Sequence, residues 1–205
     1  MGRAPRIDVA DVPYHVINRA NGRAQIFHKD EDYADFEYLL NEMREMFEMR
    51  ILAYVIMPNH WHLLLYPRID GDLSKALHWL CTSHVHRFRS RTNTIGHGHV
   101  YQDRYKSFVI EEDAHLLTVL KYIERNPVRA KMVRRAQDWK WSSAHRRISG
   151  NAKGKQLLAP SPVDMPPNYR HWINDPEPSE QLAEVRYSVE KGTMFGSVDL
   201  SRRQH

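Results

Sequence analysis

The fold is most clearly indicated by the segment MPNHWHLLL at residues 57–65, which joins two short apolar runs. The runs are Ile51–Met57 and Trp61–Tyr66, and they contain the β-branched and aromatic residues that favour strands. Between them lies Pro58-Asn59, a pair typical of tight turns. The segment therefore predicts a β-hairpin.

Working outward, the hairpin is flanked by one further strand and two helices. Residues Pro13–Arg19 alternate as a strand does, and Asn21-Gly22 ends them as a turn. Residues Glu31–Met49 and a segment opening at Gly71-Asp72 both place apolar residues at spacings of three and four, which predicts two amphipathic helices. The two apolar stripes are Tyr33, Phe36, Leu40, Met43 and Phe47, and Leu73, Leu77, Leu80, His84 and Phe88.

Further along the chain, the sequence predicts a loop, a fourth strand and a third helix. The loop is the polar segment Arg91–Gly98, and His99–Ile110 is interpreted as the strand. The acidic residues 111–113 suit a helix N-terminus, where carboxylates meet the positive end of the helix dipole. This helix is expected to run to about Asn126, because Pro127 disfavours helical conformation at the residue before it.

The order β-α-β-β-α-β followed by another helix predicts an α+β fold of the ferredoxin-like, or split βαβ, type. We expect an antiparallel sheet with two helices on one face and the other face left free. Residues 1–150 are expected to form this domain. Residues 151–205 form a Pro-rich, basic C-terminal extension, irregular except for a short helix around Ser179–Lys191.

Composition excludes several classes of protein. The chain has 205 residues, 41% hydrophobic and 27% charged, as expected for a globular protein with one ordinary domain. No apolar run approaches the ~20 residues of a membrane span, and Met1–Ala10 lacks the apolar stretch of a signal peptide, so we expect a cytoplasmic protein with no membrane partner. The single cysteine, Cys81, rules out an internal disulfide or a cysteine-rich zinc site.

Positive charge is concentrated in one stretch of the chain. The net charge is +5, but residues 121–147 hold nine Lys or Arg against Glu124 and Asp138. Such a stretch is compatible with an ordinary solvated surface. Trp139 and Trp141 favour single-stranded nucleic acid as a partner, because bases stack on rings while phosphates pair with cations.

His60 and His62 are candidate metal ligands. Side chains at i and i+2 of a strand point to the same face, so these imidazoles should lie side by side while Trp61 points away. Neutral imidazole is a common metal ligand. An isolated H-x-H pair is weak evidence, and surface or partly buried histidines are the alternative.

Tyr122 and Asn126 supply further polar groups. Being four residues apart in the predicted third helix, they should share one helix face, beside an apolar side formed by Leu116, Leu120 and Ile123. If that apolar side packs on the sheet, the phenol and the amide face the two histidines. A helical tyrosine taken alone is more often a packing residue.

These segments together resemble a known family. The motifs are MPNHWHLLL (57–65), YIERNPVRA (122–130), YHVINR (14–19) and YQDRYKS (101–107). They are similar in type and order to those of the REP-associated tyrosine transposases, which resemble the single-tyrosine HUH transposases of small bacterial insertion sequences. The resemblance covers about residues 12–145.

The resemblance implies cleavage and rejoining of single-stranded DNA next to palindromic hairpins through a covalent 5′-phosphotyrosine. It implies Tyr122 as the nucleophile and His60, His62 and Asn126 as ligands of a divalent metal, Mg²⁺ or Mn²⁺, with a closed zinc site disfavoured by the lack of soft ligands. Tyr101 and Tyr105 are competing nucleophile candidates.

The expected partner is single-stranded or hairpin DNA, and a monomer is favoured over a dimer that exchanges the tyrosine helix. Candidate DNA contacts, chosen because they stand beside the motifs, are Arg19, Arg104, Lys106, Arg129, Arg134 and Arg135. Two other interpretations stay open: a non-catalytic hairpin DNA or RNA binder, and a metal-dependent nuclease that uses water.

Overall fold

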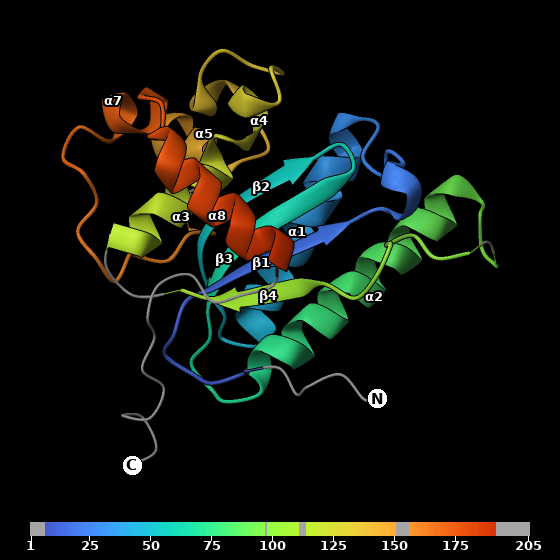
Figure 1. The fold of residues 1–205 in the computed structure, drawn as a ribbon. Helices are drawn as coiled ribbons and strands as arrows, with labels where there is room; N and C mark the ends of the chain where they lie inside the picture. Colours follow the sequence, from blue (N-terminus) through green and yellow to red (C-terminus); the bar gives the residue numbers. More distant parts are fainter. Residues whose placement is uncertain (1–6, 97, 111–113, 151–155, 192–205) are drawn as a thin grey trace.

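The computed structural model describes residues 7–96, 98–110, 114–150 and 156–191. Its centre is a four-stranded sheet in the order β2-β3-β1-β4 (Figure 1). The strands are β1 (Tyr14–Arg19), β2 (Arg50–Met57), β3 (His60–Tyr66) and β4 (Lys106–Val109). All three strand pairs are antiparallel, and β1 lies between β3 and β4. The predicted α+β, ferredoxin-like fold is confirmed.

Two long helices cover the first face of the sheet. They are α1 (Asp30–Met46) and α2 (Asp72–Thr92). The start of α1 is fixed by Asp32, whose Oδ2 accepts hydrogen bonds from the backbone nitrogens of His28 and Lys29 at 2.7 and 3.1 Å. The predicted apolar stripes of both helices face the sheet, and their buried residues form one core with Trp61 and Leu63 of β3.

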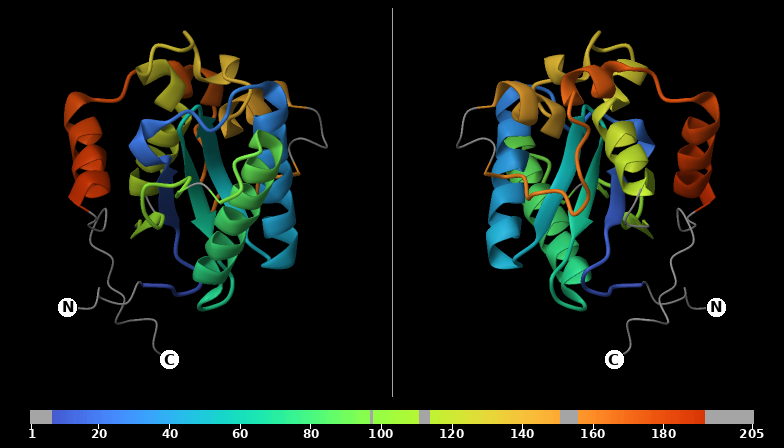
Figure 2. Two further views of the ribbon diagram at one scale, coloured as in Figure 1. Left: turned by 90° about the vertical axis from the view of Figure 1, so that its right-hand side faces the viewer. Right: turned by 90° about the vertical axis from the view of Figure 1, so that its left-hand side faces the viewer.

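The second face is also covered, so the prediction of a free face is wrong. Helix α3 (Ala114–Glu124) packs on β2 and β3, and α8 (Ser179–Lys191) packs against α3. Figure 2 shows the sheet between the two helical layers, with α1 and α2 on one side and α3 and α8 on the other. Leu64 of β3, Leu120 of α3 and Val185 of α8 belong to this second core. The sheet is therefore buried on both faces.

Several short helices complete the chain. They are η1 (Asn21–Arg23), α4 (Asn126–Arg129), η2 (Ala136–Asp138), α5 (Ser143–Ser149) and α7 (Tyr169–Asn174). The helix predicted around residues 179–191 is confirmed as α8, whereas α7 was not predicted. No helix in the described part of the chain is long and apolar enough to cross a membrane. The division of the chain at residue 150 stays a prediction.

Three predicted boundaries differ from the structure. Helix α1 ends at Met46 rather than residue 49, because Glu48 takes a left-handed backbone conformation with φ of 46°. The fourth strand is confined to residues 106–109, since Tyr101 forms only an isolated bridge with Ala20 and Gln102 bonds to the end of β1. Residues 111–113, expected to begin the third helix, lie outside the described residues.

A chain of buried hydrogen bonds lies on the first face of the sheet, beneath β3. Nε1 of Trp61 donates to the hydroxyl of Tyr101 over 2.9 Å, and that oxygen lies 2.6 Å from Nδ1 of His84. The His84 ring is fully buried and stacks on Phe27. Its Nε2 makes no hydrogen bond within the described part of the chain. Burial lowers the pKa of His84 to about 3, so this imidazole is neutral in the folded protein.

We expect truncation of the second core to destabilise the fold. Leu64 is fully buried there, and Leu64→Ala should lower the free energy of unfolding by about 2–5 kcal/mol through lost burial and a residual cavity. Ile95→Ala is the control, because that side chain is 78% exposed, and its effect should be within about 0.5 kcal/mol. Urea unfolding measures both. Equal, small effects would show that the second face is not a packed core.

We also expect His84 to make stability depend on pH. An unfolded histidine titrates near ~6.5, so the unfolded chain binds a proton that folded His84 rejects. The stabilising contribution is fully present above pH 6.5 and is lost as pH falls from 6.5 toward 3. Unfolding free energies of His84→Phe between pH 7 and 4.5 should therefore fall less steeply than those of the unsubstituted protein. Identical slopes would contradict this account.

Candidate active site

The two histidines of β3 lie side by side on the second face of the sheet. The ring centroids of His60 and His62 are 5.2 Å apart, while Trp61 between them is buried in the first core. The predicted placement of the pair is confirmed. Because β3 is flanked by β1 and β2, both imidazoles are held by strands that are hydrogen-bonded along their length.

Each imidazole has one ring nitrogen held by a neutral partner. Nδ1 of His60 lies 2.6 Å from Oδ1 of Asn59, and because that oxygen can only accept, Nδ1 carries the proton. Nδ1 of His62 lies 2.8 Å from Nε2 of His15 on β1. The His15 and His62 rings are buried and are only 19° from parallel. Both outer hydrogen bonds fix ring orientation, as partners behind metal-binding histidines do.

Asn126 approaches the free nitrogens of the pair. Its Nδ2 lies 3.1 Å from Nε2 of His62, and it also hydrogen-bonds the side chain of His60. An amide NH₂ group only donates, so Nε2 of His62 accepts and the proton of His62 is on Nδ1, directed at His15. The lone pair of Nε2 of His62 therefore points toward Asn126.

Burial keeps the pair neutral. It lowers the pKa of His60 to about 4, with a further contribution from the nearby positive charge of Arg19. It lowers the pKa of His62 well below its usual value, and the neighbouring rings of His15 and His60 act in the same direction. Near neutral pH, both imidazoles are thus unprotonated and able to donate a lone pair to a cation.

Tyr122 and Asn126 do not share one continuous helix face, contrary to the prediction. Helix α3 ends at Glu124 and α4 begins at Asn126, with Pro127 in its first turn. The helix was expected to end at about Asn126, and the structure places the break at Arg125, with Asn126 and Pro127 already in α4. Even so, the side chains of Tyr122 and Asn126 both contact His62.

The phenol ring of Tyr122 lies against the histidine cluster, which consists of His15, His60 and His62. Its centroid is 5.9 Å from that of His62 and 6.0 Å from that of His15, both in edge-to-face contact. The residue is 9% exposed. It lines a cavity of about 670 Å³ at the edge of the sheet. A tyrosine, two imidazoles and an amide therefore meet at one site within a single chain.

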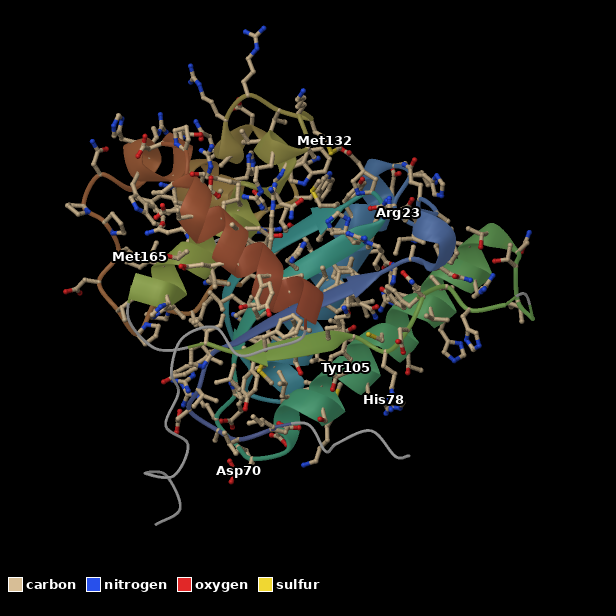
Figure 3. The ribbon with its side chains drawn as sticks, viewed as in Figure 1. Arg23, Asp70, His78, Tyr105, Met132 and Met165 are labelled. Carbon is tan, nitrogen blue, oxygen red and sulfur yellow. The ribbon has the colours of Figure 1, made fainter. Side chains whose placement is uncertain are left out.

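The competing tyrosines face away from this site. The hydroxyl of Tyr101 is bonded to Trp61 and His84 in the first core. The hydroxyl of Tyr105 donates to Oγ of Ser74 at 3.4 Å, and Figure 3 shows Tyr105 beside α2. Their positions on the opposite face of the sheet favour Tyr122 as the residue that acts with the histidines.

The predicted DNA contacts fall into three groups. Arg19, Arg104 and Lys106 line the 670 Å³ cavity together with Tyr122. Arg134 and Arg135 are exposed in the loop after α4, at the end of the molecule that Met132 marks in Figure 3, and they are not among the residues that line the cavity. Arg129 is different again, because its guanidinium carbon lies 4.1 Å from the centroid of the Tyr122 ring.

The C-terminal extension contributes to the site in a way that the sequence did not indicate. Arg186 and Val189 of α8 line the cavity beside Tyr122. Glu177, just before α8, forms ion pairs with both Arg125 and Arg129. His15 was also missed, since its role depends on strand register, and a single histidine in an apolar strand gives no signal of its partner.

The donor set at this site fits a divalent metal. No group of three or more His, Cys, Asp or Glu side chains within the described residues is arranged to hold an ion, and the polar side chain bonded to His62 Nε2 is the amide of Asn126. Neighbouring ligands of an octahedral ion with bonds of about 2.1 Å lie about 3 Å apart. The 3.1 Å between Asn126 and His62 matches this spacing, once the amide turns its oxygen in place of its nitrogen.

Comparison with known proteins identifies the family. Residues 8–126 match the family model described as "Transposase IS200 like". This match spans more than half of the chain, and the chain belongs to the IS200-like transposase family. The resemblance seen in the sequence motifs is thereby confirmed at the level of the family.

Individual relatives are distant. The chain is 26% identical over 122 residues to a Haemophilus influenzae protein described as a candidate REP-associated tyrosine transposase, covering 56% of this chain and 69% of that one. It is 23% identical over 137 residues to the Escherichia coli REP-associated tyrosine transposase, covering 66% and 78%. A solved REP-associated tyrosine transposase bound to a REP hairpin superposes with a TM-score of 0.60 at 20% identity, covering 81% of this chain and 93% of that one. This last likeness shows the shared fold.

We expect metal affinity to depend on the histidine cluster in a graded way. His15→Leu removes no proposed ligand but removes the outer hydrogen bond to His62 together with the ring contacts of His15, and it should weaken Mn²⁺ binding about 10–100-fold. His62→Ala removes a ligand and should weaken binding further. Electron paramagnetic resonance of free Mn²⁺ measures the affinity directly. His78→Ala is the control, because this exposed histidine of α2 lies outside the cluster and should change nothing. Unchanged Mn²⁺ affinity in His62→Ala would contradict the ligand assignment.

Proposed function

We propose that this chain cleaves and rejoins single-stranded DNA next to hairpins of the REP type, through a covalent 5′-phosphotyrosine formed by Tyr122. The observation that carries the proposal is the contact between Tyr122, which lines a cationic cavity, and the ring of His62, whose Nε2 is bonded to Asn126. Membership of the IS200-like transposase family and the names of the relatives support the same reaction.

In the first step, the phenol oxygen of Tyr122 attacks the scissile phosphorus and releases its proton, and the leaving 3′ oxygen takes up a proton in exchange. The new bond joins phosphorus to the tyrosine oxygen, and the bond to the 3′ oxygen of the preceding nucleotide breaks. The products are a 5′-phosphotyrosine and a free 3′-OH. Arg19, Arg104 and Lys106 line the cavity where the phosphates would lie, and their positive charges offset the charge that builds up during attack.

In the second step, a 3′-OH attacks the phosphotyrosine and the phenolate leaves. A phenolate is a better leaving group than a sugar alkoxide, so the covalent linkage stores the bond for transfer to another strand. The enzyme is regenerated and needs no nucleotide cofactor.

His60, His62 and Asn126 are proposed to hold a divalent metal. When bound, the ion would polarise the scissile phosphate and stabilise the negative charge of the transition state. Two imidazoles with one amide oxygen suit Mn²⁺ better than Mg²⁺, which prefers oxygen ligands. Both ions remain candidates, and Mn²⁺ is favoured.

The proposed substrate is a DNA hairpin with a single-stranded flank. The solved relative is bound to a REP hairpin, which supports this class of ligand. The cavity beside Tyr122 is sized for part of the flank, and the exposed Arg134 and Arg135 are proposed to contact the hairpin backbone. Tyr122 lies beside histidines of its own chain, which supports a monomer over a dimer that exchanges the tyrosine helix.

The nucleophile is tested by Tyr122→Phe, which removes one oxygen and keeps the ring. Adduct formation and strand transfer should fall by several orders of magnitude, while hairpin affinity and Mn²⁺ binding change little. The assay uses a labelled hairpin oligonucleotide with Mn²⁺, and a denaturing gel separates the protein-linked band. Tyr105→Phe is the control and should keep the band.

The same gel separates the remaining functions. Cleavage without a protein-linked band indicates a nuclease that uses water, and hairpin binding without cleavage indicates a non-catalytic binder. A band that persists in Tyr122→Phe means that the nucleophile is another residue.

A further inference from the structure

The C-terminal extension places the buried carboxylate of Glu177 close to Tyr122, with Arg129 between them. The side chain of Glu177 is 4% exposed and lies between two arginines that follow α3. Oε2 of Glu177 is 2.6 Å from Nε of Arg125, and Oε1 is 2.8 Å from Nη1 of Arg129. Because the exposed fractions of the Arg125 and Arg129 side chains are only 7% and 15%, water screens these pairs weakly.

Arg125 joins the extension to the end of α3. Besides its pair with Glu177, its Nη1 donates to the carbonyl oxygen of Ile173 at the end of α7 over 3.0 Å. Its backbone nitrogen bonds to Lys121 in the last turn of α3. The carboxylate of Glu177 is therefore fixed relative to the helix that carries Tyr122.

Arg129 contacts both Glu177 and Tyr122. Its Nη2 donates to the carbonyl oxygen of Tyr122 over 2.5 Å, and its guanidinium carbon lies over the phenol ring, 4.1 Å from the centroid. That carbonyl belongs to the last turn of α3, where carbonyls lack partners within the helix. A guanidinium is planar and presents its donors in a fixed fork. The Glu177 carboxylate bonds one nitrogen of the Arg129 guanidinium, and the Tyr122 carbonyl bonds another. Together they fix the position of the guanidinium beside the Tyr122 ring.

We propose that Glu177 is a positioning residue for Tyr122, acting through Arg129. The inference rests on the proposed role of Tyr122 as the nucleophile, and it gives the extension a part in the reaction. In-line attack on phosphorus requires the phenol oxygen in a narrow range of positions, and a misplacement of about 1 Å can cost about 100-fold in rate. Glu177 restricts the ring by holding the guanidinium that covers one of its faces.

The matched pair of variants is Glu177→Gln and Tyr169→Phe. Glu177→Gln keeps the shape of the side chain but removes the charge that orients Arg129. Tyr169→Phe removes another link between the extension and α3, the hydrogen bond from Tyr169 to the buried Glu124, without touching Arg129. If the extension acts only as packing, both variants should behave alike. We expect Glu177→Gln to lower kcat for adduct formation about 10–100-fold with KM for the hairpin nearly unchanged, and Tyr169→Phe to leave kcat nearly unchanged.

A double-mutant cycle tests whether Glu177 acts on Tyr122 through Arg129. In an Arg129→Gln background, Glu177→Gln should have little further effect on kcat, because the residue through which it acts is already gone. Arg129→Lys gives a second test if Glu177→Gln fails to fold. Lysine keeps the charge beside Glu177 but cannot bond the carboxylate and the carbonyl through a planar fork, so kcat should fall again. Full additivity in the cycle, or a normal kcat in Arg129→Lys, would overturn the proposal.

Ring position can also be read without catalysis. With 3-fluorotyrosine at position 122, the ¹⁹F resonance should shift in Glu177→Gln and stay in place in Tyr169→Phe. An unchanged resonance in Glu177→Gln would sink the positioning role. A shifted resonance combined with an adduct that survives Tyr122→Phe would show instead that Glu177 positions the ring while the nucleophile is a different residue. The two proposals therefore fail separately.

Discussion

The two-residue period of β3 is the constraint on which the rest of the structure depends. Trp61 and Leu63 enter the core beneath α1 and α2, while His62 and Leu64 face α3. A slip of one residue would place the imidazoles in the first core and the indole at the site. Pairing with strands on both sides and the hydrogen bond from Trp61 to Tyr101 oppose such a slip. The register of β3 thus determines which of its side chains enter each core and places His60 and His62 at the candidate site.

Positively and negatively charged side chains occupy different positions around the candidate site. The histidines and Asn126 are neutral, the cations Arg19, Arg104 and Lys106 line the cavity, and Asp103 is the one carboxylate among the residues that line it. Two carboxylates near α3, those of Glu124 and Glu177, are buried and paired. Glu124 is bonded by Ser143, Tyr169 and Arg147, and Glu177 by two arginines. This arrangement presents positive potential to a phosphate backbone and keeps acidic groups from competing with it.

The sequence was sufficient for the features that depend on local periodicity. The hairpin at residues 57–65, the two long helices and the shared face of His60 and His62 follow from spacings of two, three and four residues. A helix end near Pro127 was also predictable, because proline has no N–H with which to continue the helical bonding, although the break lies at Arg125 and Asn126 is itself helical. These local rules gave the order of elements and hence the ferredoxin-like topology.

Features that depend on contacts between distant segments were not predictable. Periodicity showed that α3 has an apolar side but not that α8 would pack against it, so the second face was expected to be free. His15 meets His62 diagonally across two strands, which requires the register to be known. Glu177 finds Arg125 and Arg129 across roughly fifty residues of Pro-rich chain that carries no regular pattern. Side chains paired over such distances leave no trace in a single sequence.

The ion pairs of Glu177 also bear on the order in which the protein is made. A ribosome adds about 5–20 residues per second, so His15, the histidine pair and Tyr122 are all synthesised on the order of seconds before Glu177. During that interval, the nascent chain has the proposed nucleophile and the proposed metal ligands but not the carboxylate that pairs with Arg129 beside the phenol ring. On the proposed roles of Tyr122 and Glu177, efficient cleavage would thus begin only after Glu177 has emerged and paired with Arg129.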